Sequence, residues 1–187
     1  MKLPVVGVMG SGTEDHAALA RPLGRLLAES GVHLLTGGGG GAMACVARAF
    51  VEVENRAGLV IGVLPGHPAP PGYPNPWVEI AIATHLPGRG GRGVDAVSRN
   101  AINVLSSDLV IALPGGAGTA SEVELARGYG RRVLLIGWDD AEAIAGDSPG
   151  VASVEAAKPL IRDALDGLHR DGLSRAQTSR GCEVENP

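Results

Sequence analysis

The chain has 187 residues, of which 29 are glycine and 3% are aromatic, and its formal net charge is −4. This length fits one domain with a substantial core, and the acidic balance, without a basic stripe, argues against a nucleic-acid partner. Its two lysines, Lys2 and Lys158, lie outside the glycine-rich segments. A Walker phosphate loop needs a lysine beside its glycines, so the sequence excludes this motif. A pyridoxal-phosphate enzyme needs a lysine at its site, so this class of enzyme is disfavoured.

Strand-like and helix-like segments alternate along the chain. Short apolar runs predict strands over 3–9, 32–36, 59–64, 77–83, 108–113 and 132–136. Apolar residues at helical spacing predict helices over 15–30, 42–55, 94–107, 117–129 and 153–170. We expect the proline-rich segment 67–76 to be irregular and the glycine- and arginine-rich segment 86–93 to be mobile.

This alternation predicts a single domain over residues 1–173, followed by a disordered polar tail over 174–187. Strands that alternate with helices form an α/β fold with a mainly parallel sheet and right-handed crossovers. Ligands of such sheets lie beyond the carboxyl ends of the strands. The loops that contain Gly10, Gly37 and Gly115 all follow predicted strands, so we expect them to share that edge.

Metal-ligand spacings and targeting signals are both missing from the sequence. Cys45 and Cys182 are far apart, and the five histidines share no ligand spacing. No apolar run approaches the length of a membrane span, and the first one has the length of a strand rather than of a signal peptide. We therefore expect a cytoplasmic protein with reduced thiols, no metal and no membrane partner.

The glycine loops are the features that point to a ligand. A helix that opens directly after such a loop offers unpaired N–H groups and a favourable dipole to phosphate. Each loop also has a purely structural explanation, since glycines serve tight turns and close helix–sheet contact. Five consecutive glycines, Gly37–Gly41, exceed the needs of a turn, which favours a backbone that approaches a ligand.

A dinucleotide fingerprint is a weaker interpretation of the third loop. Gly116 and Gly118 have the right spacing, but Ser121 stands where the third small residue belongs. Asp139 and Asp140 end the next predicted strand, near the spacing at which an acidic residue would hold a ribose. An NAD-binding oxidoreductase therefore stays open as an alternative.

Two charged residues near these loops allow two roles each. Thr119 and Glu122 have the spacing of a capping box, in which the glutamate would bond the Thr119 N–H. The same carboxylate could instead stabilise a sugar cation or orient a water molecule. Arg99 is flanked by apolar positions, so it would be partly buried and would need an anionic partner such as phosphate or Glu122. We expect Tyr73 to pack in the proline-rich segment rather than to stack on a base.

Several segments together resemble a known superfamily. They are Thr36-Gly-Gly-Gly-Gly-Gly-Ala-Met43, Gly58-Leu-Val-Ile-Gly-Val-Leu-Pro-Gly66, Ser98-Arg-Asn100 and Pro114-Gly-Gly-Ala-Gly-Thr-Ala-Ser-Glu122. The resemblance, over roughly residues 3–170, is to the Lonely Guy phosphoribohydrolases and the molybdenum cofactor carrier proteins. It implies a Rossmann-like, doubly wound sheet flanked by helices on both faces, a homodimer or homotetramer, and a phosphorylated nucleotide-like ligand. An older label for the group, putative lysine decarboxylase, is disfavoured by the positions of the lysines.

The resemblance also assigns roles to individual residues. In the hydrolases the last of these motifs binds phosphate and supplies a catalytic glutamate, which corresponds to Glu122, and a catalytic arginine corresponds to Arg99. The hydrolases typically follow that arginine with lysine, whereas this chain has Asn100, which looks more like the carrier branch. We therefore expect carrier-like binding of a nucleoside monophosphate or of molybdenum cofactor. A phosphoribohydrolase that cleaves nucleoside 5′-monophosphates is the alternative.

The expected site combines this catalytic pair, Glu122 and Arg99, with a larger set of binding residues. No cofactor is expected to be required, and an AMP-like nucleotide or molybdenum cofactor is the expected bound molecule. The expected phosphate- and ligand-binding residues are Gly10, Ser11, Gly12, Thr13, Gly37, Gly38, Gly39, Gly40, Gly41, Met43, Pro65, Asn100, Pro114, Gly115, Gly116, Ala117, Gly118 and Thr119.

Overall fold

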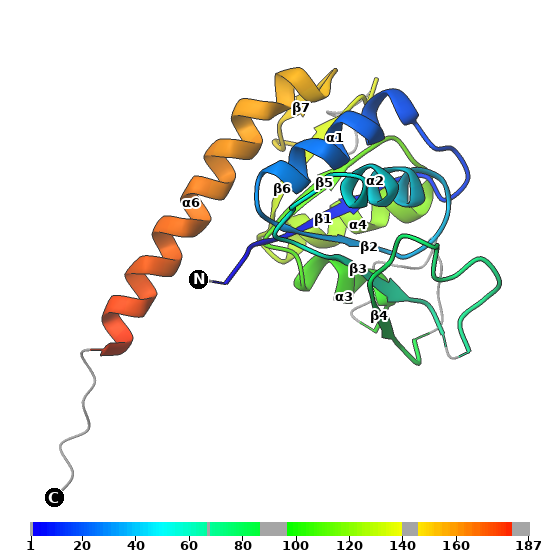
Figure 1. Cartoon of the computed structure of the whole chain (residues 1–187), viewed down its shortest axis with the longest axis horizontal. Helices are drawn as coiled ribbons and strands as arrows, with labels where there is room; N and C mark the ends of the chain where they lie inside the picture. The colour runs from blue at the N-terminus through cyan, green and yellow to red at the C-terminus, as the bar shows by residue number, and fades with distance from the viewer. Residues whose placement is uncertain (1, 67, 87–96, 140–145, 181–187) are drawn as a thin grey trace, which may run out of the picture.

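A parallel sheet forms the centre of the molecule (Figure 1). The computed structural model describes residues 2–66, 68–86, 97–139 and 146–180. Its strands are β1 (Val5–Met9), β2 (His33–Thr36), β3 (Val60–Leu64), β4 (Ile80–Ala83), β5 (Leu109–Ala112), β6 (Arg132–Ile136) and β7 (Gly150–Val151). They lie in the order β4-β3-β2-β1-β5-β6-β7, and each adjacent pair is parallel.

Helices cover both faces of this sheet. They are α1 (Ala17–Glu29), α2 (Gly41–Val51), α3 (Arg99–Leu105), α4 (Ala117–Gly128) and α6 (Val154–Arg180). Alternate strand residues point to opposite faces, so Val6 and Val8 pack against α1, α2 and α6, while Met9 packs in the second core with α3 and α4. The predicted Rossmann-like, doubly wound α/β fold is confirmed.

The strand order reverses direction between β1 and β5. From β1 the chain moves outward through β2 and β3 to β4, and from β5 it moves the other way through β6 to β7. The loops after β1 and β5 therefore diverge and leave a crevice at the carboxyl end of the sheet, which is where open α/β sheets bind ligands. The Ser11 N–H donates to the Pro114 carbonyl at 3.1 Å and ties these two loops together.

Several element boundaries differ from the sequence prediction. Helix α3 begins at Arg99 because Ser98 caps it, accepting a 3.2 Å hydrogen bond from the Ala101 N–H. Strand β4 begins at Ile80, after a turn in which the Val78 N–H bonds the Asn75 carbonyl. The two-residue strand β7 was not predicted, since so short a segment carries no periodic pattern.

The last helix also exceeds its prediction. Helix α6 continues to Arg180, so the first residues of the expected tail over 174–187 are helical rather than irregular. No proline follows Pro159 in this segment, and nothing there interrupts the helical backbone. Residues 181–187 and most of the segment expected to be mobile, 87–93, lie outside the described residues. Within the described residues, no helix is long and apolar enough to cross a membrane.

Candidate functional site

A cavity of about 590 Å³ lies at the crevice beyond β1 and β5. Each of the three glycine loops contributes to its wall, as their positions after parallel strands predict. The lining residues are Gly10, Ser11, Gly12, Thr13, Gly40, Met43, Pro71, Gly72, Tyr73, Arg99, Asn100, Gly116, Gly118, Thr119 and Glu122. A volume of this size is typical of sites for small molecules.

The hydroxyl group of Ser11 holds the turn of the first loop, which follows β1. Its Oγ accepts hydrogen bonds from the N–H groups of Thr13 and Glu14, at 3.2 and 3.0 Å. The third loop packs directly against this turn. A methyl group at Gly115 would lie 3.0 Å from the Ser11 nitrogen and would collide with the Thr119 side chain. Gly115 thus allows the first and third loops to meet, although it does not line the cavity itself.

Two helices start at the edge of the cavity. Helix α2 follows Gly40 and helix α4 follows Gly116, and neither start has a side-chain cap. The first N–H groups of a helix have no partner within it. In α2 the Ala42 N–H already donates a hydrogen bond to the Ser11 carbonyl, at 2.9 Å. The start of α4 is the better candidate for an anion, because both Gly116 and Gly118 line the cavity.

Most of the five-glycine run serves packing within the protein. A methyl group at Gly37 would collide with Arg99 Nη1, and one at Gly39 would lie 2.6 Å from the Tyr73 hydroxyl. Within the run, Gly40 is the residue that lines the cavity. Packing therefore explains much of the run, while our interpretation that the excess of glycine serves the approach of a ligand stays a prediction.

Arg99 is buried at the first position of α3, with 5% of its surface exposed. Its Nε atom is buried and has no hydrogen-bond partner among the described residues. A buried guanidinium nitrogen without a partner is costly, and phosphate or carboxylate oxygens are the groups that match its geometry. The side chain lines the cavity, so it is placed to meet an anion there.

Glu122 is buried on the same wall, with 7% of its surface exposed. Its Oε1 accepts a 2.9 Å hydrogen bond from the Asn103 side-chain amide. Burial raises the pKa of Glu122 above its ordinary value, while the positive charge of Arg99 and the Asn103 hydrogen bond oppose that rise. The carboxyl group therefore takes up a proton more readily than an exposed glutamate does.

The capping box predicted for Thr119 and Glu122 is wrong. Helix α4 begins at Ala117, and its N-cap residue is Gly116. Thr119 consequently lies within the first turn, and the Glu122 carboxyl group bonds α3 instead of the start of its own helix. Glu122 is thus free of a capping role and belongs to the wall of the cavity.

The proline-rich segment supplies a wall that the sequence prediction missed. Pro71, Gly72 and Tyr73 line the cavity, whereas we expected Tyr73 only to pack within its own segment. Asn75 anchors this segment to the glycine run. Its Nδ2 donates to the Gly39 carbonyl at 2.8 Å, and its backbone N–H donates to the Gly38 carbonyl at 2.8 Å. The position of this asparagine between two prolines was the feature of the sequence that could have indicated this wall of the cavity.

The remaining predicted residues lie behind the cavity or beside it. Pro114 bonds the first loop through its carbonyl group. Asp139, which the oxidoreductase alternative requires, is not a lining residue, and neither is either lysine. The other predicted binding residues outside the lining set are Gly37, Gly38, Gly39, Gly41, Pro65, Gly115 and Ala117. Across the part of the chain that the structure describes, no cluster of histidine, cysteine or acidic side chains could hold a metal ion.

A doubly wound parallel sheet with a cavity between glycine loops defines a Rossmann-like class of ligand-binding proteins. Within that class, the chain belongs to the SLOG cluster4 family, whose model matches residues 3–159. The resemblance predicted from the loop motifs is confirmed by this match and by the solved structures.

Two similar solved structures carry descriptive names. The molybdenum cofactor carrier protein from Chlamydomonas reinhardtii is 34% identical, with a TM-score of 0.70 over 88% of this chain and 99% of that one. The molybdenum cofactor binding protein from Rippkaea orientalis is 35% identical, with a TM-score of 0.69 over 87% of this chain and 98% of that one. An uncharacterised protein of Archaeoglobus fulgidus is 36% identical over 138 residues, which is 73% of this chain and 82% of that protein.

Proposed function

We propose that the protein binds a phosphorylated nucleotide-like molecule in the cavity and acts as its carrier. The candidates are a nucleoside monophosphate and molybdenum cofactor, whose phosphate group is their shared feature. The observation that carries the proposal is the convergence of the first loop, the start of α4 and the buried Arg99 on one cavity. The names of the two structural relatives support the second candidate.

The residues present fit a phosphate group. The hydroxyl groups of Ser11 and Thr13 lie on one wall, and the uncapped start of α4 lies on another. Arg99 adds a fixed positive charge with an unpartnered buried Nε. Hydroxyl groups, helix N-termini and guanidinium groups are the usual partners of phosphate oxygens. A ligand phosphate would therefore lie between the first and third loops.

The first test is whether a ligand binds at all. The purified protein is denatured, and any released molecule is identified by mass spectrometry. In parallel, AMP and molybdenum cofactor are titrated while the melting temperature is measured. We expect one of them to raise the melting temperature, because a ligand that binds the folded state stabilises it. The proposal fails if neither molecule raises the melting temperature and none is released.

The second test places the ligand at the start of α4. A side chain at Gly116 would meet no atom within 4 Å, so the fold tolerates a substitution there. Gly116→Asp would add an N-cap but would put a negative charge at the cavity wall, and Gly116→Asn is its neutral match. We expect the aspartate variant to bind the ligand at least about tenfold more weakly than the asparagine variant. Equal affinities of the two variants would place the phosphate elsewhere.

A phosphoribohydrolase remains the second candidate function, because Glu122 and Arg99 both line the cavity. In that reaction water would attack C1′ of a nucleoside 5′-monophosphate, the N-glycosidic bond would break, and the base would leave with a proton. Glu122 would direct the water or stabilise the sugar cation, and Arg99 would hold the phosphorylated ligand. Incubation with AMP should then release adenine, and Glu122→Gln should abolish the release. The absence of free base with the unchanged protein would leave the carrier function alone.

We also propose that the protein forms a homodimer or homotetramer. All residues of the edge strand β4 are exposed, including Ile80 and Ile82 at 42% and 41%. An edge strand with apolar side chains is prone to contact another chain. Sedimentation velocity at micromolar concentration should detect a species of two or four chains, and a monomer would contradict this proposal.

A further inference from the structure

The cavity has one apolar part among walls that are otherwise polar. Its apolar lining side chains are Met43, Pro71 and Tyr73, whereas the other lining residues are glycines or carry hydroxyl, amide or charged groups. The chain has two tryptophans, two tyrosines and one phenylalanine, and Tyr73 is the aromatic residue of the described lining. The proposed function uses the polar walls to hold a phosphate group, and it leaves this apolar part without a role.

Met43 and Tyr73 meet over the glycine run. A methyl group at Gly39 would lie 2.6 Å from the Tyr73 hydroxyl and 2.9 Å from Met43 Cε, so both side chains occupy the space that Gly39 leaves open. Met43 Cε also lies near the first loop, 3.8 Å from the position of a methyl group at Gly12. Met43 therefore connects the first loop, where we place the phosphate, to Tyr73.

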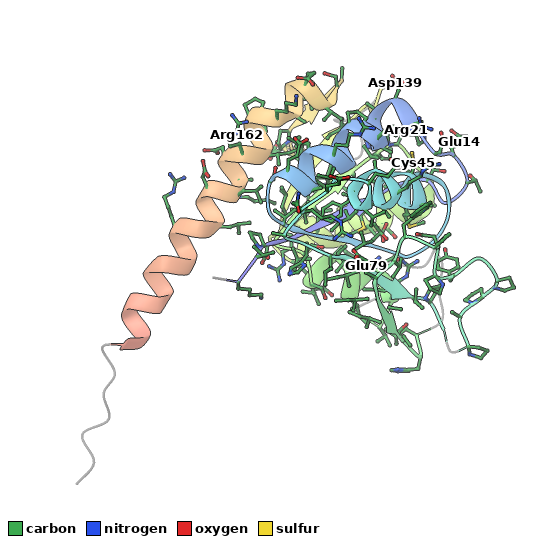
Figure 2. All side chains as sticks on the ribbon, in the orientation of Figure 1. Glu14, Arg21, Cys45, Glu79, Asp139 and Arg162 are labelled. Atoms are coloured by element: carbon green, nitrogen blue, oxygen red, sulfur yellow. The ribbon has the colours of Figure 1, made fainter. Side chains whose placement is uncertain are left out.

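The segment that carries Tyr73 is fixed to the body of the protein. Asn75 bonds the carbonyl groups of the glycine run through its side chain and its backbone. Glu79, labelled in Figure 2 and directly before β4, accepts hydrogen bonds from Arg56 Nη2 at 2.8 Å and from the Val60 N–H at 2.9 Å. A side chain that is held in place before the ligand arrives loses little conformational freedom on binding.

The ring of Tyr73 can be reached from the cavity. Its hydroxyl end lies against Gly39, but the residue is only half-buried and lines the cavity. Bases of different identity stack on such a ring, because every base has a π-face. The thioether of Met43 adds a polarizable surface that favours contact with aromatic rings. This part of the cavity therefore suits a flat heteroaromatic group.

We propose that Tyr73, with Met43 beside it, stacks on the planar ring of the ligand, so that the site selects phosphates that carry a heteroaromatic ring over simple sugar phosphates. This inference rests on the proposed function, because a phosphate beside the first loop sets the position of the ring. Both candidate ligands carry such a ring, as a purine base in AMP and as a pterin in molybdenum cofactor. Tyr73 is then a specificity-determining residue.

The test compares phosphates with and without the ring. Ribose 5-phosphate, AMP and, without oxygen, molybdenum cofactor are titrated calorimetrically into the unchanged protein and into Tyr73→Ala. We expect Tyr73→Ala to bind the ring-bearing ligand at least about tenfold more weakly, because stacking on an aromatic side chain is lost. Ribose 5-phosphate should bind to both proteins equally, and the separate titrations of AMP and molybdenum cofactor distinguish a base from a pterin.

Two further variants separate the effect of the ring from the effect of its bulk. Tyr73→Phe keeps the ring and should bind as the unchanged protein does, whereas Tyr73→Leu keeps only an apolar side chain and should bind as weakly as Tyr73→Ala. Tyr129→Ala is the matched control, because it removes a tyrosine at the end of α4 that is outside the cavity lining. This control should leave all affinities unchanged.

The outcomes for this inference and for the proposed function differ. If a ring-bearing ligand binds and Tyr73→Ala or Tyr73→Leu holds it as tightly as the unchanged protein, this inference is overturned and the proposed function stands. The same conclusion follows if ribose 5-phosphate binds to the unchanged protein as tightly as the ring-bearing ligands do. If none of the three ligands binds, both are overturned.

Discussion

The Asn103 side-chain amide donates a 2.9 Å hydrogen bond to Glu122 Oε1 and joins α3 to α4 beneath the cavity. Both side chains are buried, and Asn103 is completely so. The bond therefore sets the position of a carboxyl group that also lines the cavity. The stability of the two helices and the protonation of the site consequently depend on the same contact.

Removal of the Asn103 amide should destabilise the protein. Asn103→Ala leaves the buried Glu122 carboxyl group without this donor, and we expect the free energy of unfolding to fall by about 2 kcal/mol. Urea denaturation measures the change. In the double variant with Glu122→Gln, the two losses should not add, because the residues share one bond. A loss below about 0.5 kcal/mol would show that the bond contributes little.

The stability of the protein should depend on the protonation of Glu122. Because burial raises its pKa in the folded state, the folded chain binds more protons than the unfolded chain between the ordinary and the raised value. The free energy of unfolding should therefore fall as the pH rises through this interval. Thermal unfolding between about pH 4 and pH 8 tests this, and Glu122→Gln should have a flatter profile. Identical profiles for the two proteins would contradict the raised pKa.

A methyl group at Gly37 should disturb Arg99. Gly37→Ala would make this group collide with Arg99 Nη1, and the overpacking should cost about 1–3 kcal/mol. Gly128→Ala is the matched control, because a methyl group there would meet no atom within 4 Å at the end of α4. The control should be neutral or slightly stabilising. Equal melting temperatures for the two variants would rule out the packing role of Gly37.

Loss of Asn75 should loosen the wall that holds Tyr73. The Asn75 side chain donates to the Gly39 carbonyl and accepts from the Trp77 N–H at 3.1 Å. Asn75→Ala should lower the free energy of unfolding by about 1–3 kcal/mol and weaken ligand binding. Hydrogen exchange should show faster exchange at the Trp77 amide, whereas exchange in the distant strand β6 should be unchanged. Unaltered exchange at Trp77 would contradict this anchoring role.

The sequence was sufficient for the layers of the fold but not for the side-chain contacts of the site. Strands and helices follow local periodicity, so the alternation predicted the parallel sheet and the edge where the glycine loops meet. The start of α4 at Ala117 was predicted correctly, but the capping box at Thr119 and Glu122 was wrong, because the tertiary structure bonds the Glu122 carboxyl group to Asn103 of α3 instead. The contacts of Gly37 with Arg99 and of Asn75 with Gly39 join distant segments, and no local pattern encodes them.

The central position of β1 has a consequence for the order in which the chain folds. Strand β1 pairs with β2 nearby in sequence, but its other partner, β5, is about a hundred residues further on, where Asp108 Oδ2 accepts a 2.8 Å bond from the Val5 N–H. Pairings of such long range are slow to form because the loop between them must first be closed. We expect the β1–β5 seam to close late, so the crevice along it exists only once folding is nearly complete.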